Sequence, residues 1–157
     1  MENFDILRIV GCRKPTAIAY IKGSSEYPQI KGEVRFCRVS SGVLVATKVY
    51  GLPEANGKNG VFAFHIHEGG SCSGNSEDPF ADAKTHYNPT GAEHPYHAGD
   101  MPPLFSNKGY AMSVFFTDRF TVDEIIGRTV IIHSGVDDFT TQPSGNSGKK
   151  IACGKII

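Results

Sequence analysis

All six histidines of this 157-residue chain lie between positions 65 and 133. Two of them, His65 and His67, alternate within the largely apolar run 61–68. Because strand side chains point to alternate faces, these two imidazoles should leave the same face of one strand. Imidazole nitrogen is a preferred ligand of zinc and copper, so this rigid pair could hold a metal ion.

The other candidate ligands follow in two further stretches. They are His86, His94, His97, Asp100 and, later, His133. A single histidine is more often an ordinary surface or core residue than a ligand, and six histidines are only slightly above normal usage for this length. The clustering and the His-X-His pair nevertheless favour a transition-metal site. Spacing alone decides neither which metal binds nor how many ions bind.

Length and charge narrow the class of protein. The whole chain, 1–157, suits one domain with its own core. Sixteen basic and sixteen acidic side chains give no net charge, which argues against a nucleic acid or a membrane as partner. No apolar stretch approaches the roughly 20 residues of a membrane helix. The start, 1–5, lacks the pattern of a signal peptide. We therefore expect a cytoplasmic protein if the chain is complete, and a periplasmic or extracellular one if a leader was removed.

Short apolar runs alternate with turn residues along most of the chain. The runs expected to form strands are 16–22, 32–39, 43–52, 61–68, 110–117, 128–134 and 151–157. In the second run, Val34 and Phe36 share one face while Arg35 and Cys37 share the other. Short strands at this spacing predict an antiparallel sandwich or barrel. Residues 121–127 predict a loop with one helical turn.

Three stretches lack this patterning. They are 56–60, 69–103 and 135–149. The longest, 69–103, holds five of the nine prolines. An irregular stretch of this length is unusual in a compact domain unless it is functional or tied down. Because it also contains Cys72 and four candidate ligands, a disulfide and a metal ion would replace the missing ladder of hydrogen bonds.

The four cysteines are Cys12, Cys37, Cys72 and Cys153. No two of them have CxxC spacing, which argues against a thiolate zinc site. Four cysteines allow three complete pairings, and composition does not choose among them.

Seven short blocks contain nearly all of these chemistry-bearing residues. They are HIHE at 65–68, GSC at 70–72, HYNP at 86–89, HAGD at 97–100, IGRTVIIH at 126–133, GNSG at 145–148 and ACG at 152–154. In this order they resemble the copper/zinc superoxide dismutases, and the segment 86–100 resembles the bacterial-type branch. The likeness begins near residue 16, which leaves 1–15 as an N-terminal extension. It implies an all-β fold, an eight-stranded Greek-key flattened barrel (an immunoglobulin-like sandwich) with two long functional loops.

The resemblance implies a role for each candidate ligand. Copper would take His65, His67, His86 and His133. Zinc would take His86, His94, His97 and Asp100. His86 would bridge the two ions as an imidazolate. Asp137 would be an outer carboxylate, bonded to His65 on the copper side and to His94 on the zinc side.

The implied reaction is the dismutation of superoxide to oxygen and hydrogen peroxide. Copper would cycle between oxidation states, His86 would supply a proton, and zinc would be structural. The alternative is a non-catalytic metal-binding barrel, either a copper store, a copper-delivery module or a zinc-only relative. A zinc-only relative would be expected to lack copper ligands, and none is missing here, which favours the enzyme. The resemblance also allows a homodimer.

Cys72 and Cys153 occupy the positions of the family's intra-chain disulfide. Two free thiols are the alternative, which a cytosolic location would favour, but the flanking blocks favour the bond. Cys12 and Cys37 have no family counterpart, and we expect them to be free.

Three departures from the family concern the approach to copper. Lys150 stands where the family has an arginine at the mouth of the copper channel. The segments 94–97 and 138–145 are shorter than in the animal enzymes, and the second lacks their charged cluster. Lys150 would offer a positive charge to a small anion, without the guanidinium fork. A solvated surface lysine beside Lys149 is the alternative.

Overall fold

The computed structural model describes residue 12 and residues 14–54 and 60–157. Over these residues the chain forms eight strands and two short helices. The strands are β1 (Ala17–Gly23), β2 (Lys31–Val39), β3 (Gly42–Tyr50), β4 (Val61–His67), β5 (Asp100–Phe105), β6 (Ala111–Thr117), β7 (Thr129–His133) and β8 (Lys150–Lys155). The helices are the 3-10 turn η1 (Ala81–Ala83) and α2 (Val122–Ile125). The start, 1–5, and nearly all of the predicted loop at 56–60 lie outside the described residues.

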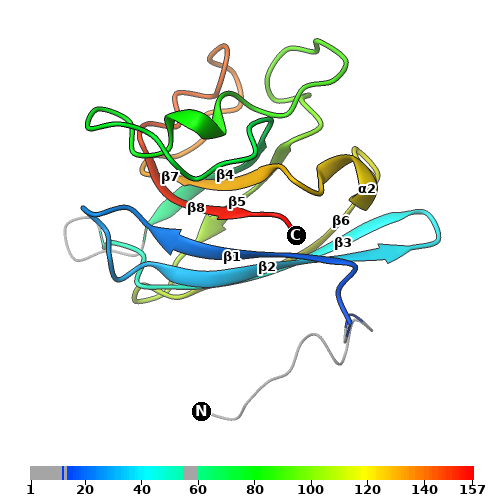
Figure 1. The fold of residues 1–157 in the computed structure, drawn as a ribbon, viewed down its shortest axis with the longest axis horizontal. Helices are drawn as coiled ribbons and strands as arrows, with labels where there is room; N and C mark the ends of the chain where they lie inside the picture. The colour runs from blue at the N-terminus through cyan, green and yellow to red at the C-terminus, as the bar shows by residue number, and fades with distance from the viewer. Residues whose placement is uncertain (1–11, 13, 55–59) are drawn as a thin grey trace.

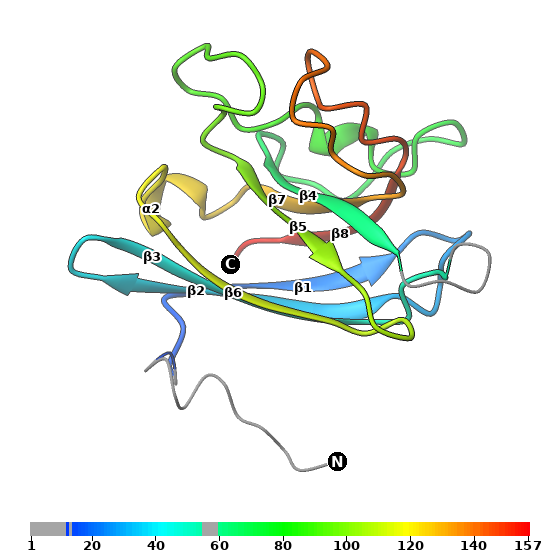
Figure 2. The same cartoon turned by 180° about the vertical axis from the view of Figure 1, so that it is seen from behind.

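The strands are hydrogen-bonded in the order β5-β4-β7-β8-β1-β2-β3-β6. The pairs β3–β6 and β4–β7 join strands that are distant in sequence, as in a Greek key. Two layers result, with β1, β2, β3 and β6 in one and β4, β5, β7 and β8 in the other (Figures 1 and 2). The end strands β5 and β6 contact each other, so the barrel is nearly closed. The predicted all-β Greek-key fold is confirmed. Among the described residues, no helix is long and apolar enough to cross a membrane.

The core lies between the two layers and follows the predicted alternation. In β2, Val34 and Phe36 are fully buried in it, whereas Cys37 belongs to a separate cluster. In β4, Phe64 and Ile66 also point into this core. All five residues of β7 are buried, and so are the last six residues of β4. Both faces of these two strands are therefore covered. Two long loops cover the outer face of these strands: one between β4 and β5, and one between β7 and β8. Both lie on the side of this layer away from β1, β2 and β3 (Figures 1 and 2).

The expectation that residues 69–103 lack regular structure is wrong at its end, because β5 begins at Asp100. The alternation was hidden by Pro102 and Pro103, which cannot donate a ladder hydrogen bond. β5 tolerates them because it is an end strand that pairs only with β4 among the described strands. The register of that pairing shifts between Phe62 and Phe64 of β4.

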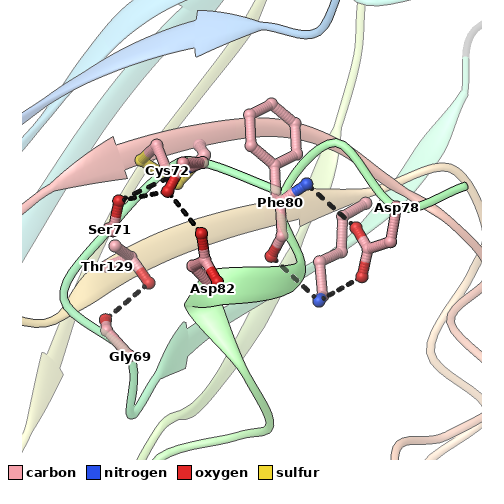
Figure 3. Close-up of a disulfide and its surroundings, with 10 residues drawn as sticks. Gly69, Ser71, Cys72, Asp78, Phe80, Asp82 and Thr129 are labelled. Carbon is pink, nitrogen blue, oxygen red and sulfur yellow. Dashed lines mark hydrogen bonds and ion pairs between the residues drawn. A yellow bond between two sulfur atoms is a disulfide. The ribbon is translucent and has the colours of Figure 1, made fainter. Parts of the chain in front are cut away.

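The disulfide predicted between Cys72 and Cys153 is confirmed (Figure 3). It joins the loop after β4 to β8, and it packs in a small cluster with Phe80, Ala83 and Ile131. Thr129 of β7 adds a second tie, since its hydroxyl donates to the Gly69 carbonyl at 3.0 Å. The first part of the long loop is therefore fixed to the barrel.

The expectation that Cys12 and Cys37 are free thiols is wrong, because they form a second disulfide. Cys37 points away from the core, on the outer face of β2, and both cysteines are buried in a cluster with Ala46. Leu44 and Val114 pack against this cluster. The bond ties the segment before β1 to the outer face of the sheet. Periodicity could not reveal it, because Cys12 precedes the first strand.

Candidate metal centre

Seven side chains form two groups on the outer face of β4 and in the loops above it. The first group is His65, His67, His86 and His133, and the second is His86, His94, His97 and Asp100. Within each group the potential ligand atoms lie within 4.8 Å of one another. All six histidines are buried, with exposed fractions of 6% or less. The structure thus brings together every ligand candidate named from the sequence, and His86 belongs to both groups.

Strands position most of the first group. His65 and His67 leave β4 on the face opposite Phe64 and Ile66, as their spacing predicts. β7 pairs with β4 and ends at His133. His86 comes from the long loop, but an isolated β-bridge links its backbone to His67.

The long loop and β5 supply the rest of the second group. Asp100 is the first residue of β5 and pairs with His65 in the sheet. His94 is held from the other long loop by the Gln142 amide, which accepts from its N–H at 2.9 Å and donates to its carbonyl at 2.8 Å. The Arg119 guanidinium donates to the Pro95 carbonyl at 2.9 Å. Sequence reasoning missed Gln142 and Arg119, because a loop glutamine or arginine has no distinguishing pattern.

Outer hydrogen bonds determine which ring nitrogen carries the proton in the first group. The Nδ1 of His67 donates to the Lys84 carbonyl at 2.8 Å, and the Nδ1 of His133 donates to the Gly148 carbonyl at 3.3 Å. A neutral imidazole has only one N–H, so each ring keeps a lone pair on Nε2. These two Nε2 atoms lie 3.2 Å apart. Two facing lone pairs repel each other, and a cation bound to both rings removes that conflict.

Asp137 likewise determines which nitrogen carries the proton in two further rings, His65 and His94. Its Oδ2 accepts from His65 Nε2 and its Oδ1 from His94 Nε2, each at 2.8 Å. The Nδ1 atoms of both rings therefore carry lone pairs, and both are buried without a hydrogen-bond partner. His94 Nδ1 does lie 3.0 Å from Asp100 Oδ2, but both atoms are acceptors, so the contact is not a hydrogen bond. Buried acceptors of this kind cost about 1–3 kcal/mol each when unpaired.

His86 faces both groups through its two nitrogens. Its Nδ1 lies 2.8 Å from Asp100 Oδ1 and 3.2 Å from His97 Nδ1, in the second group. Its Nε2 is buried without a hydrogen-bond partner and is left for the first group. One imidazole can therefore serve two ions at once.

Burial favours the neutral form of His65, His67 and His133 by lowering the pKa of each ring. Burial, together with the neighbouring His65, lowers the pKa of His133 to about 3. Burial also lowers the pKa of His67 well below its usual value. Burial alone would raise the pKa of Asp137, but hydrogen bonds from His65 and His94 hold it below its usual range. Neutral imidazoles and an ionised outer carboxylate are the states that favour metal binding.

The two donor sets fit different ions. Four imidazole nitrogens suit copper, whereas three imidazoles and one carboxylate suit tetrahedral zinc. Gly145 makes room for the shared carboxylate. A Cβ at this position would lie 2.0 Å from Asp137 Oδ1 and 2.6 Å from His94 Nε2, and the backbone φ is +69°. The family resemblance singled out the block 145–148, but the sequence did not reveal this steric reason for a glycine at position 145.

A cleft of about 690 Å³ opens onto the site. Three first-group rings line it, together with Lys150. The Lys150 ammonium lies 2.7 Å from Asp78 Oδ2 and donates to the Phe80 carbonyl at 3.1 Å (Figure 3). The structure thus places this lysine beside the site and ties it to the disulfide-bonded loop.

Comparison with known families agrees with this geometry. The family model described as copper/zinc superoxide dismutase (SODC) matches residues 30–156. The chain belongs to this family. As a member of the copper/zinc superoxide dismutases, it is an enzyme that dismutates superoxide, with copper and zinc as its cofactors.

Individual relatives come from several kingdoms. Superoxide dismutase (Cu-Zn) 2 of Aquifex aeolicus (strain VF5) is 36% identical over 143 residues, which cover 82% of this chain and 80% of that protein. The extracellular superoxide dismutase of Drosophila melanogaster is 35% identical over 160 residues, covering 89% and 83%. The enzyme of Schizosaccharomyces pombe (strain 972) is 34% identical over 158 residues, covering 89% and 96%. Bacterial proteins are thus among the relatives, in line with the resemblance of 86–100 to the bacterial-type branch.

Proposed function

We propose that the first group holds copper, that the second holds zinc, and that His86 bridges the two ions. Copper would be bound by His65, His67, His86 and His133, and zinc by His86, His94, His97 and Asp100. The observation that carries this assignment is the direction of the lone pairs. In His65, His67 and His133, the outer hydrogen bond occupies one nitrogen and leaves the other for the shared centre.

The chain's own residues then account for proton supply. Bound copper supplies the one-electron chemistry that oxidises one superoxide to oxygen and reduces a second, while bound zinc is redox-inert. Forming hydrogen peroxide from superoxide consumes two protons. His86 is the proposed donor of one of them, because its Nε2 is buried in the first group while its Nδ1 is held toward Asp100 and His97. Only Nε2 is then available to take up and release a proton.

Asp137 would orient both halves of the site from outside. Its two oxygens hold one ring from each group in the tautomer that leaves Nδ1 available. Outer carboxylates of this kind also raise the basicity of the ring that they bind.

Lys150 is the proposed guide for the superoxide anion. It lines the same cleft as His67, His86 and His133, and it stands where the family has an arginine. An ammonium attracts an anion but cannot hold it at two points as a guanidinium can.

An oxidising compartment, periplasmic or extracellular, is the proposed location. Two disulfides support it, because such bonds persist mainly outside the reducing cytosol. Thiol titration of protein taken directly from cells tests this proposal. Four reactive thiols per unfolded chain would contradict it.

The metal assignment is tested by elemental analysis after reconstitution with copper and zinc, combined with a superoxide assay. We expect one copper and one zinc per chain and rapid consumption of superoxide. Failure to bind copper would refute the assignment. Binding of both metals without activity would instead support a non-catalytic copper store.

A further inference from the structure

The Lys150–Asp78 ion pair bears on how an anion reaches the first group. The carboxylate lies 2.7 Å from the ammonium (Figure 3). The Lys150 side chain is 14% exposed, whereas that of Asp78 is 40% exposed. An anion that enters the cleft therefore meets an Asp78 side chain that is more accessible than that of Lys150.

The whole cleft is balanced in charge. Its charged lining residues, apart from the histidines, are Lys84, Lys149, Lys150, Glu26, Glu77 and Asp78. Three positive and three negative groups sum to zero. A cleft concentrates anions when charges of one sign line it, so this lining gives little net attraction. Removing one carboxylate would leave an excess of one positive charge.

We propose that Asp78 is a specificity-determining residue that limits anion capture in this cleft by neutralising Lys150. The inference deepens the proposed function and rests on the role given there to Lys150. At this separation the pair acts on an approaching anion as a dipole, whose field falls off faster with distance than that of a single charge. Lys84 and Lys149 are then the cleft-lining cations left without an ion pair among the described residues, and the Lys84 carbonyl accepts from His67 Nδ1.

A purely structural role for Asp78 is the competing explanation. Its Oδ1 accepts from the Phe80 N–H at 3.0 Å, so the carboxylate also shapes the disulfide-bonded loop. Asp78→Asn keeps an oxygen for that bond and removes the charge. Asp82→Asn is the matched control, because Asp82 lies in the same loop, binds the Ser73 hydroxyl and does not line the cleft.

The test measures the second-order rate of superoxide consumption by the copper- and zinc-loaded protein over a range of ionic strength. Asp78→Asn should raise the rate at low salt, on the order of two- to fivefold, and steepen its salt dependence. Asp82→Asn should match the parent. Azide titration of the Cu(II) protein, followed by visible absorption, gives a readout that does not depend on turnover. Azide affinity should rise in Asp78→Asn alone.

A double substitution separates charge from structure. Lys150→Met should lower the rate, and adding Asp78→Asn to it should restore a rate near that of the parent, because the summed charge is then unchanged. An unchanged or lower rate in Asp78→Asn at full metal content would overturn the proposal, as would an equal rise in Asp82→Asn. If Asp78→Asn fails to load metal, Asp78→Ser supplies the same test. A parent that binds both metals but consumes no superoxide would refute the enzymatic function, while the azide series would still judge Asp78.

Discussion

Single nitrogen atoms determine what this site can bind. Each acceptor oxygen behind a ring accepts the N–H of that ring, which leaves the opposite ring nitrogen free to bind a metal ion. Backbone carbonyls do this for His67 and His133, and Asp137 does it for His65 and His94. His67 and His133 belong only to the first group, whereas Asp137 contacts one ring of each group. Substitutions at this scale should therefore separate the two metals.

His133→Ala should abolish copper binding and dismutation while zinc stays bound. His133 belongs only to the first group, and the second group keeps all four of its members. Elemental analysis of the reconstituted variant gives the measurement. The converse control is His97→Ala, which should lose zinc more readily than copper. Full copper occupancy in His133→Ala would remove this histidine from the site.

Asp137→Asn should weaken zinc binding by about 10- to 100-fold with little effect on the fold. An amide has one acceptor oxygen, so it cannot accept from both His65 and His94. Competition with a zinc chelator measures the affinity, and circular dichroism reports the fold. Asp138→Asn is a close control, because Asp138 is exposed and its side chain, within the described part of the chain, bonds only to Thr140 and Thr141. Equal zinc affinity in the two variants would count against the proposed role of Asp137.

At the scale of elements, two strands and one long loop carry the six histidines of the site. β4 and β7 are buried on both faces and carry three of the histidines. The loop between β4 and β5 carries three more and is tied down by the Cys72–Cys153 bond. Metal and disulfide should therefore stabilise that loop much more than the barrel, which has its own core.

Chelation combined with reduction should loosen residues 69–99 before the barrel unfolds. The loop would lose its ligand bonds and its covalent tie, while the strand ladders would remain. Hydrogen exchange, read peptide by peptide, measures the order of these events. Chelation alone and reduction alone serve as controls and should each give a smaller effect. Equal protection of the loop in the treated and untreated proteins would contradict this prediction.

Cys12→Ser combined with Cys37→Ser should lower the free energy of unfolding by about 3.5 kcal/mol in the simple chain-entropy model. The bond joins residues 25 apart in sequence and lies in an outer cluster separate from the metal groups. Copper and zinc content should therefore not change. Urea denaturation measures the loss, and elemental analysis provides the control. Loss of either metal would show that the outer cluster supports the site.

These elements also show what sequence can and cannot predict here. Strands with one buried face were found because alternation reports burial directly, as in Val34 and Phe36. β5 was missed because Pro102 and Pro103 imitate a loop. The ligands were found because all of them except His94 lie in short, contiguous sequence blocks. Gln142 and Arg119 were missed because they act through backbone contacts across loops, which depend on three-dimensional proximity alone.

At the scale of the whole molecule, electrostatics is local rather than global. The sequence has no net formal charge, and the lining of the cleft is balanced as well. Long-range attraction of a small anion must then depend on a few side chains near the opening. Such attraction is screened within about 10 Å at 0.1 M salt.

Lys150→Glu should lower the second-order rate of superoxide consumption sharply at low ionic strength, and added salt should narrow the gap to the parent. The substitution would place a new carboxylate beside Asp78, so the cleft would change from neutral to negative by two charges. Lys150→Arg should keep the rate or raise it, because a guanidinium can hold a small anion at two points. Lys149→Glu is the control for charge alone, and it should have a smaller effect because Lys149 is exposed, so solvent and salt screen its charge more strongly. Stopped-flow measurement at several salt concentrations gives all four rates. If Lys150→Glu equals the parent at low salt, then Lys150 only ties the loop through Asp78 and Phe80, and other residues attract the anion.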